Sequence, residues 1–451
     1  MIMKPAMFVA CVVLVLGAPP AALAQTAAAG PTAPLESTQS PAPQPPKLTL
    51  DDAIRVALAQ HPALRQAREA IVAAEARTKQ AKSAYFPQIT ASGIAKQGLS
   101  GASGALGLRG LVTSPLFRDI GASSAAFQNL YDFGRTAHQV KASKWAAVSL
   151  NHALEAEQSF VVLDVQQAYY STLQQQRLVT VDEKILADRQ LIARQAAAFY
   201  NAQIRSKVDV SLAEVGVSNA NLELVRARDQ LRTAFAELNR AMGADGAPVY
   251  ALEEPKITIE SPPALEPLIA ESQQKRPDLL AIDTQIKSDE EIVARARSNR
   301  WPKLALLFSS GWVRFSEYSP GRLLLGAFGI DLPIFTGGRI EAEIEEAKAN
   351  LAQSRAGRDA LAQNIRFQVQ RAHNELISAI EAIRASEQLI AQAREAMRLA
   401  QVRYRVNIGS FVELSAAEAA SSNAEAQYAQ ARYRYKLADS LLNYAAGRRS
   451  P

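Results

Sequence analysis

The sequence predicts a mainly α-helical fold made of two copies of one unit, in which a pair of β-strands precedes a long helical hairpin. Three observations predict it. Short motifs from the first half recur in the second half, long proline-free stretches carry helical apolar spacing, and a segment with strand-like alternation precedes each stretch. Similarity over so long a period sets the architecture before any single motif is interpreted.

The duplication is visible at several independent markers. Phe86-Pro87 returns as Trp301-Pro302, which is 215 positions later, and Gly134 returns as Gly338 at an offset of 204. The first copy therefore carries 11 extra residues in one loop. The expected units are a first repeat, a connector, a second repeat and a tail, over residues 47–243, 244–264, 265–447 and 448–451. Each repeat is expected to begin with one short helix before its strand pair.

The N-terminus has the features of a secretory signal peptide over residues 1–24. Lys4 supplies positive charge, an apolar stretch follows, and Ala22-Leu23-Ala24 matches an A-x-A cleavage site. A membrane anchor is the alternative, but the apolar run is too short to span comfortably. The only cysteine, Cys11, lies inside this segment, so no disulfide or thiolate metal site is expected in the mature chain. Residues 25–46 are rich in Ala, Pro, Thr and Gln and predict a disordered leader.

Composition and scattered polar residues exclude several classes of function. The formal net charge of +6 is modest for 451 residues, and with export it argues against nucleic acid as a partner. The four histidines have no metal-ligand spacing, so no metal or cofactor is expected. Acidic runs such as Asp182-Glu183 are typical of solvated helix faces. Since no nucleophile, base and orienting group assemble, the chain is not expected to be an enzyme.

Each repeat contains a long helical hairpin, over residues 134–243 and 338–447. These spans lack proline and are dominated by good helix formers. Apolar residues recur with helical spacing in a narrow, Ala-rich stripe. The first helix of each hairpin is predicted to have about 65 residues, or roughly 100 Å. A duplicated rod of this length spans a gap and does not fold around a substrate pocket.

Each hairpin bends once, near Tyr200–Lys207 and Tyr404–Phe411. Ser206 and Ser410 stand where they can cap the next helix, and an acidic residue follows each of them three positions later. This spacing is that of a capping box.

The strand pairs are expected at about 85–133 and 301–334. In the second pair, Leu304, Leu306 and Phe308 alternate with the residues between them, and a turn follows at Ser319–Gly321. Aromatic residues at the strand ends and strands of about 10 residues fit a transmembrane barrel hairpin, although a soluble hairpin has a similar pattern. Open sheet edges are not tolerated in a bilayer, so several chains would have to share one barrel. A trimer would give twelve strands.

Together these motifs resemble the TolC family of outer-membrane efflux and secretion channels, and the resemblance covers about residues 48–447. The motifs that carry it are Leu48–Ile54 with His61–Leu64, Arg276–Leu279, Leu332–Gly338 and Tyr404–Ala417. The resemblance implies a homotrimer in the outer membrane of a Gram-negative bacterium. A twelve-stranded barrel would continue into an α-helical tunnel through the periplasm. The connector, with a short strand signal at Ile257–Ile259, would join an equatorial belt.

The resemblance also implies the function. The chain would be the outer-membrane exit duct of a tripartite efflux or type I secretion system. It would pass substrates from an inner-membrane pump of RND or ABC type, through a periplasmic adaptor, to the outside. Outer-membrane lipid would surround the barrel.

In the family, two acidic positions one helical turn apart ring the narrow periplasmic tip. The first falls on Glu413 and the second on Ala416, so the resemblance implies one ring of three carboxylates in the trimer. Such a ring attracts cations. A helix cap is the alternative role for Glu413. Tyr404 matches a tyrosine that helps to hold the closed tip, whereas the arginine of that lock aligns with Gly409, so the lock must differ.

The two tips are the expected contact with the adaptor, and ordinary solvent-facing turns are the alternative. The residues concerned are Ile204, Arg205, Ser206, Ile408, Gly409 and Ser410. Gln203 and Asn407 stand where the family usually has glycine. Asn tolerates left-handed backbone angles, but Gln does so poorly.

Two other classes of protein share some of these features. A periplasmic adaptor, or membrane fusion protein, also carries a long helical hairpin, but it would have one hairpin between β-rich segments and not two equal copies. A structural coiled-coil protein of the envelope would not need the strand pairs.

Overall fold

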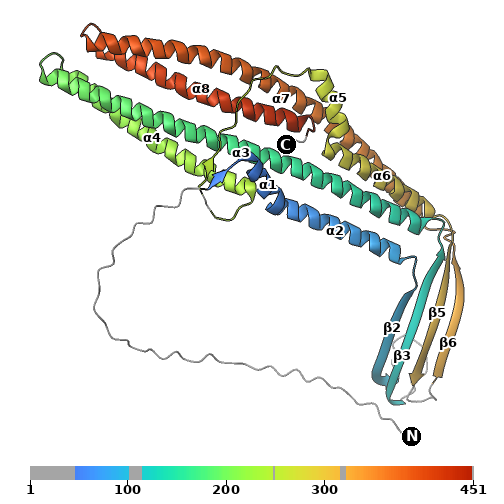
Figure 1. Cartoon of the computed structure of the whole chain (residues 1–451). Coiled ribbons are helices and arrows are strands. Elements are labelled where there is room, and N and C mark those ends of the chain that lie inside the picture. The colour runs from blue at the N-terminus through green and yellow to red at the C-terminus, as the bar shows by residue number, and fades with distance from the viewer. Residues whose placement is uncertain (1–45, 101–113, 247–248, 315–320, 449–451) are drawn as a thin grey trace, which may run out of the picture. The chain divides into compact units, whose positions relative to one another are not determined.

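The computed structural model describes residues 46–100, 114–246, 249–314 and 321–448, and all structural statements refer to these (Figure 1). The predicted signal peptide and nearly all of the predicted leader lie outside the described residues. So does most of the Gly/Ser-rich loop between the first two strands, and most of the predicted turn at Ser319–Gly321.

The helices of the two copies match one another. The first copy has α1 (Leu50–Gln60), α2 (Pro62–Ser83), α3 (Arg135–Asn201) and α4 (Lys207–Met242). The second copy has α5 (Leu265–Lys275), α6 (Pro277–Ser298), α7 (Arg339–Arg405) and α8 (Phe411–Ala445). Helices α3 and α7 each have 67 residues, which is about 100 Å of helix. The predicted duplicated, mainly helical fold is therefore confirmed.

One short helix was predicted before each strand pair, but the structure has two. The breaks fall at His61 and Arg276, whose ψ angles of 128° and 121° are extended. Each residue precedes a proline, and the proline ring disfavours helical angles in the residue before it. Pro62 and Pro277 then begin the next helix, where no backbone N–H is needed.

The strands form one antiparallel sheet in the order β2-β3-β5-β6 (Figure 1). Their bounds are Gln88–Ser100, Ser114–Tyr131, Lys303–Arg314 and Gly321–Asp331. The two hairpins are β2-β3 and β5-β6, and the pairing of β3 with β5 joins the two copies. Strands β2 and β6 are the sheet edges, and each pairs on one side only within the described chain.

The two faces of this sheet differ in chemistry. Side chains alternate between faces along a strand, and the strand register places large apolar residues on one face, each 44–75% exposed. They are Ile89, Leu306, Phe308, Trp312, Leu324, Phe328 and Ile330. The other face is mostly small or polar, and the hydroxyls of Ser92 and Ser123 lie 2.8 Å apart across β2 and β3.

The core lies along the helices and has no single centre. One cluster gathers where α1, α3 and α4 meet and includes Val165 and Leu238, and a second gathers α5–α8 around Ile365 and Leu442. Helix α3 contacts α8, which brings the two long hairpins together. None of the described helices is both long and apolar enough to cross a membrane.

A second, two-stranded sheet ties the connector to the start of the first repeat. Strand β1 (Lys47–Leu48) pairs in parallel with β4 (Ala251–Leu252). The Tyr169 hydroxyl of α3 donates to the carbonyl oxygens of Leu48 and Glu253, at 3.0 and 2.8 Å. The expected strand at Ile257–Ile259 was wrong. There the Tyr435 hydroxyl donates to the Thr258 carbonyl, so a side chain of α8 takes the place of a strand partner.

Candidate functional site at the hairpin tips

Both long hairpins turn through the same backbone motif. Gln203 and Asn407 have φ angles of 58° and 64°, in the left-handed region. The next residue in each tip, Ile204 or Ile408, donates its N–H to the carbonyl five residues earlier, at 2.9 Å. This is the Schellman motif, which usually has glycine at the left-handed position. Gln203 therefore keeps the first tip in the geometry of the second, despite its poor preference for these angles.

The capping serines differ between the two tips. The Ser410 hydroxyl accepts a hydrogen bond from the Glu413 N–H at 3.1 Å, so the predicted cap of α8 is present. Ser206 occupies the same position before α4, but its side chain makes no capping hydrogen bond. That expectation was wrong, because the Asp209 N–H instead donates to the Ser206 carbonyl at 3.2 Å.

Tyr404 lies at the centre of the tip and joins the two hairpins. Its side chain is 1% exposed, and its ring centroid lies 5.7 Å from that of Phe199 at the end of α3 and 6.1 Å from that of Phe411 at the start of α8. Its hydroxyl has no hydrogen-bond partner among the described residues. Burial raises the pKa of the Tyr404 phenol, and the nearby charge of Asp209 raises it further. The phenol therefore stays neutral at physiological pH.

Arg205 reaches from the first tip to the second. Its guanidinium lies 5.1 Å from the Tyr404 ring centroid and donates to the Gly409 carbonyl oxygen at 2.6 Å. A charged donor and a cation over an aromatic ring are both stabilising in a half-buried setting. A cation from the first hairpin thus contacts Gly409 of the second.

Glu413 stands at the entrance to α8 and has a partner in its own chain. Its carboxylate lies 2.9 Å from Arg403 of α7, and both side chains are about half exposed. Such exposed ion pairs contribute little to stability. The carboxylate remains accessible to solvent, although Arg403 offsets part of its charge.

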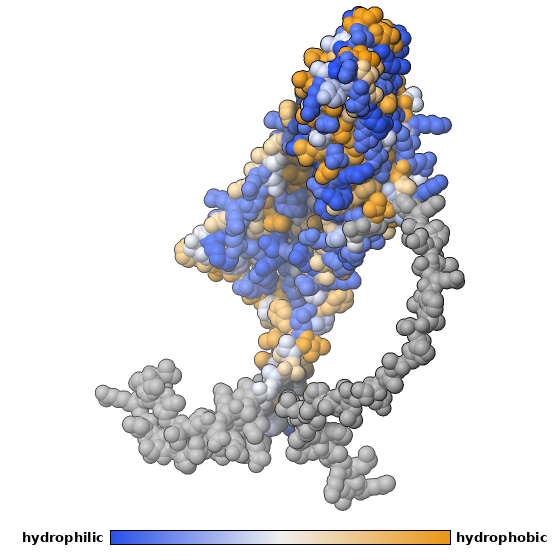
Figure 2. All heavy atoms as spheres, turned by 90° about the vertical axis from the view of Figure 1, so that its left-hand side faces the viewer, coloured by the Kyte–Doolittle hydropathy of each residue, from blue (hydrophilic) through white to orange (hydrophobic). Residues whose placement is uncertain are grey.

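The six residues expected to meet an adaptor fall into two groups. Ile204 and Ile408 are 50% and 71% exposed, and Ser206 and Ser410 are also exposed. Arg205 and Gly409 face each other within the chain. Figure 2, turned toward the side on which the tips lie in Figure 1, shows apolar patches among hydrophilic residues.

Sequence reasoning missed a buried ion pair farther along the hairpins. Glu418 of α8 is 2% exposed, and its carboxylate lies 3.0 Å from the Arg189 guanidinium of α3. Glu418 shares the helix face of Phe411 and Leu414, which are both buried. Phe411, Leu414 and Glu418 are spaced i, i+3 and i+7 along the helix, so an acidic residue in line with two apolar ones was the sign of this buried charge in the sequence.

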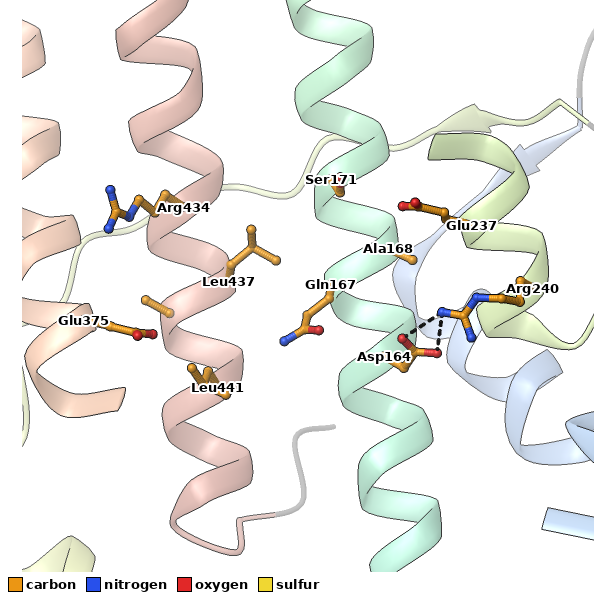
Figure 3. Close-up of a pocket in the computed structure, with 11 residues that line it drawn as sticks. Asp164, Gln167, Ala168, Ser171, Glu237, Arg240, Glu375, Arg434, Leu437 and Leu441 are labelled. Atoms are coloured by element: carbon orange, nitrogen blue, oxygen red, sulfur yellow. Dashed lines mark hydrogen bonds and ion pairs between the residues drawn. The ribbon is translucent and has the colours of Figure 1, made fainter. Parts of the chain in front are cut away.

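A groove of about 500 Å³ lies between the hairpins near their middle (Figure 3). Arg240 of α4 donates to both carboxylate oxygens of Asp164 of α3 at 3.1 Å, and Glu375 and Arg434 stand across the groove on α7 and α8. The charges are of both signs. Within the described ranges, no three His, Cys, Asp or Glu side chains gather as a metal site would require.

The fold defines a class of proteins in which a strand pair and a long helical hairpin are each present twice. The family model for outer membrane efflux proteins matches residues 53–244 and 268–448, and the chain belongs to this family. The resemblance and the outer-membrane location predicted from the sequence are confirmed. It is a family of transport ducts and not a class of enzymes.

Curated relatives agree with this assignment. The outer membrane protein TolC of Escherichia coli K12 is 22% identical over 332 residues, which is 68% of this chain and 66% of that protein. The outer membrane efflux protein BepC of Brucella suis is 24% identical, over 70% of this chain and 67% of that protein. The chain thus spans about two thirds of the length of these relatives. The toluene efflux pump outer membrane protein TtgC of Pseudomonas putida is 24% identical over 80% of this chain and 75% of that protein.

Solved structures share the fold. A membrane protein from Pseudomonas aeruginosa superposes with a TM-score of 0.77 at 23% identity, over 88% of this chain and 93% of that one. The Campylobacter jejuni CmeC outer membrane channel also gives 0.77, at 14% identity, over 88% and 85%. The open state of the Neisseria gonorrhoeae MtrE outer membrane channel gives 0.73 at 19% identity, over 88% and 89%.

Proposed function

We propose that the chain is the exit duct of a tripartite efflux or type I secretion system. It passes substrates from an inner-membrane pump of RND or ABC type and a periplasmic adaptor through the outer membrane, and it makes and breaks no bond itself. Family membership supports the duct. That TtgC is named as the outer membrane protein of a toluene efflux pump supports the partner pump.

The four-stranded sheet is the observation that carries this proposal. Seven large apolar side chains crowd one face and are 44–75% exposed. In water such a patch is unfavourable, at roughly 25 cal/mol per Å² of apolar surface, whereas lipid tails would cover it. The other face is mostly small or polar, as the wall of a water-filled pore would be, and carries fewer large apolar side chains, among them Phe127, Leu307 and Leu325.

The open edges of this sheet support a homotrimer. The free sides of β2 and β6 would leave backbone N–H and C=O groups without partners in a bilayer, where each costs several kcal/mol. Pairing β6 of one chain with β2 of the next satisfies both edges. Three chains then form a closed barrel of twelve strands, and outer-membrane lipid surrounds its outer face.

The outer surface of α4 also supports assembly. Helix α4 exposes a run of apolar side chains, each 45–63% accessible, and three of them recur every seven residues. They are Val208, Leu212, Val215, Leu222 and Val225. A heptad seam of this kind packs against another helix. A second copy of the chain beside the first hairpin supplies that helix in the proposed trimer.

The tips form the gate and the contact with the adaptor in this proposal. Tyr404 and Arg205 hold the two hairpins of one chain together, and three Glu413 carboxylates ring the narrow end and favour cations. The exposed residues Ile204, Ser206, Ile408 and Ser410 are the adaptor contacts, and Gly409 and Arg205 shape the turn beneath them.

Single-channel recording in planar bilayers tests the duct. The purified protein should run as a trimer in native mass spectrometry and insert as stable pores, and Glu413→Ala should lower their cation selectivity. Glu223→Ala is the matched control, since Glu223 is an exposed carboxylate on α4 that pairs with Arg226. Folded protein that never inserts would overturn the proposal. Pores whose selectivity is the same in all three proteins would leave Glu413 as a helix cap only.

A further inference from the structure

Arg189 and Glu418 form an ion pair that is buried between the two long hairpins. The Glu418 carboxylate is 2% exposed and the Arg189 side chain 16% exposed, with 3.0 Å between them. Arg189 also donates to the Ser415 hydroxyl at 3.2 Å, one turn earlier on α8. On its other side, a methyl group at Gly216 of α4 would lie 3.4 Å from the guanidinium, so Arg189 is seated between two helices.

The pair is held by charge more than by hydrogen bonds. Neither oxygen of Glu418 accepts a hydrogen bond of normal geometry among the described residues. A buried charge is costly unless it is paired, and replacing such a pair with apolar residues is often neutral or stabilising. The pair is therefore a poor source of stability, and what it does fix is which part of α3 lies against which part of α8.

The Arg189–Glu418 ion pair lies next to the cluster that packs the tip together. Two turns from Glu418, Tyr404 and Phe411 pack with Ile192 and Ala196 of α3 in the cluster that closes the tip. Any widening that draws the second hairpin away from the first must expose Glu418 to water. On the proposed function, we infer that Arg189 and Glu418 are positioning residues that fix the register of the second hairpin on the first, and that the buried Glu418 carboxyl sets how readily the periplasmic end widens.

The ratio of closed to separated hairpins should depend on pH. Burial is the largest cause that raises the pKa of Glu418 to about 7, and Asp188 adds to it while Arg189 opposes it. In the separated hairpin the carboxyl regains a value near 4.5. The closed form thus binds a proton that the separated form releases. Acid favours the closed form, and this preference is lost as the pH rises through 7.

The charged groups near Glu418 come from α3 and α4. The nearest helix, α3, supplies both Arg189 and Asp188, whereas α7 contributes apolar side chains to the neighbouring cluster. The further charged groups that line the adjoining groove are Asp182 of α3 and Glu223 of α4. Between pH 8 and pH 6, one carboxyl with these two pKa values shifts the closed-to-separated ratio by about tenfold.

Recordings of the full-length protein in planar bilayers at pH 8 and pH 6 test the inference. The time spent in the widest conductance level should fall about tenfold on acidification in the wild type. Glu418→Gln, which mimics the protonated carboxyl at similar volume, should show the low value at both pH values. Glu183→Gln is the matched control, because Glu183 pairs with Arg228 within the first hairpin and is half exposed. It should behave as the wild type does.

A readout in detergent separates this inference from the proposed channel function. The rate of tryptic cleavage at the exposed Arg405 and Lys207 should follow the same order of pH and variant. Arg189→Met combined with Glu418→Met, an apolar pair of similar size, should fold and lose the pH response. A wild type whose cleavage and conductance ignore pH, or a Glu418→Gln variant that keeps the full response, would overturn the inference. Failure to insert at all, with pH-dependent cleavage intact, would count against the channel alone.

Discussion

Removing the Arg205 side chain should release the second tip from the first. Arg205→Met keeps the length and the apolar stem of the side chain but removes the hydrogen bond to the Gly409 carbonyl and the cation over Tyr404. A hydrogen bond from a charged donor contributes about 1.5–3 kcal/mol, and a half-exposed cation–π contact contributes about 0.5–2 kcal/mol. The expected loss is therefore about 2–5 kcal/mol of closed-state stability.

That loss corresponds to a large change in populations. Each 1.4 kcal/mol is a factor of ten, so the closed-to-separated ratio of the tips should fall by about 30-fold or more. Hydrogen exchange of the Ile204 and Ile408 amides reports on it, because each N–H group is hydrogen-bonded within one of the two turns that Arg205 joins. Protection of both amides should drop in the variant. Conductance in bilayers should rise at the same time.

Two comparisons make the result interpretable. Arg205→Lys keeps a cation near Tyr404 without the planar fork and should show an intermediate loss. Arg226→Met removes an exposed arginine that pairs with Glu223 within α4 and should change nothing. Wild-type protection in Arg205→Met would refute the reasoning, since it would mean that Tyr404 and Phe411 close the tip without the cation.

Four other substitutions test the backbone and the core. Gln203→Gly should stabilise the protein by about 0.5–1 kcal/mol in urea unfolding, because the left-handed strain exceeds the entropy that glycine adds. Gly243→Ala should cost about 1–3 kcal/mol, because φ is +64° and the new methyl would lie 3.0 Å from the His61 Cα. Gly357→Ala within α7 should instead stabilise the protein by up to about 1 kcal/mol, because alanine has the higher helix propensity and the new methyl has room. Tyr169→Phe should cost about 1–3 kcal/mol at pH 8, because two carbonyl groups lose their donor. Burial raises the pKa of Tyr169 to about 12, so the stability that the phenol contributes is complete below pH 10 and is lost as the pH rises toward 12. Between pH 8 and pH 11, the free energy of unfolding should therefore fall less in the variant than in the wild type.

The duplication predicted the helical architecture because each boundary has a local cause. Glycine begins both long helices with left-handed angles at Gly134 and Gly338, and the helices then run without interruption through proline-free sequence. Such signals act over a few residues and are readable from one sequence. The break at His61 was also readable from Pro62, but it was missed because the apolar spacing continues across it.

The errors at the site have a different origin. Whether Ser206 caps α4 depends on which acceptor the Asp209 N–H reaches, and residue type does not decide this. The pairing of Arg189 with Glu418 joins positions 229 residues apart, which only the packing of α3 on α8 brings together. The Arg205 guanidinium contacts the Gly409 carbonyl from the opposite hairpin, and no local signal in the sequence points to that contact.

The join between β3 and β5 has a consequence for how the complex is made. Within the chain this joint closes at an effective concentration set by the connecting polypeptide, whereas the β6-to-β2 joint must form between molecules. A ring of six half-length chains would have six joints between molecules, and the proposed trimer has three. Carrying both copies in one chain thus halves the number of joints that must form between molecules, and it leaves each half free to diverge at its own tip.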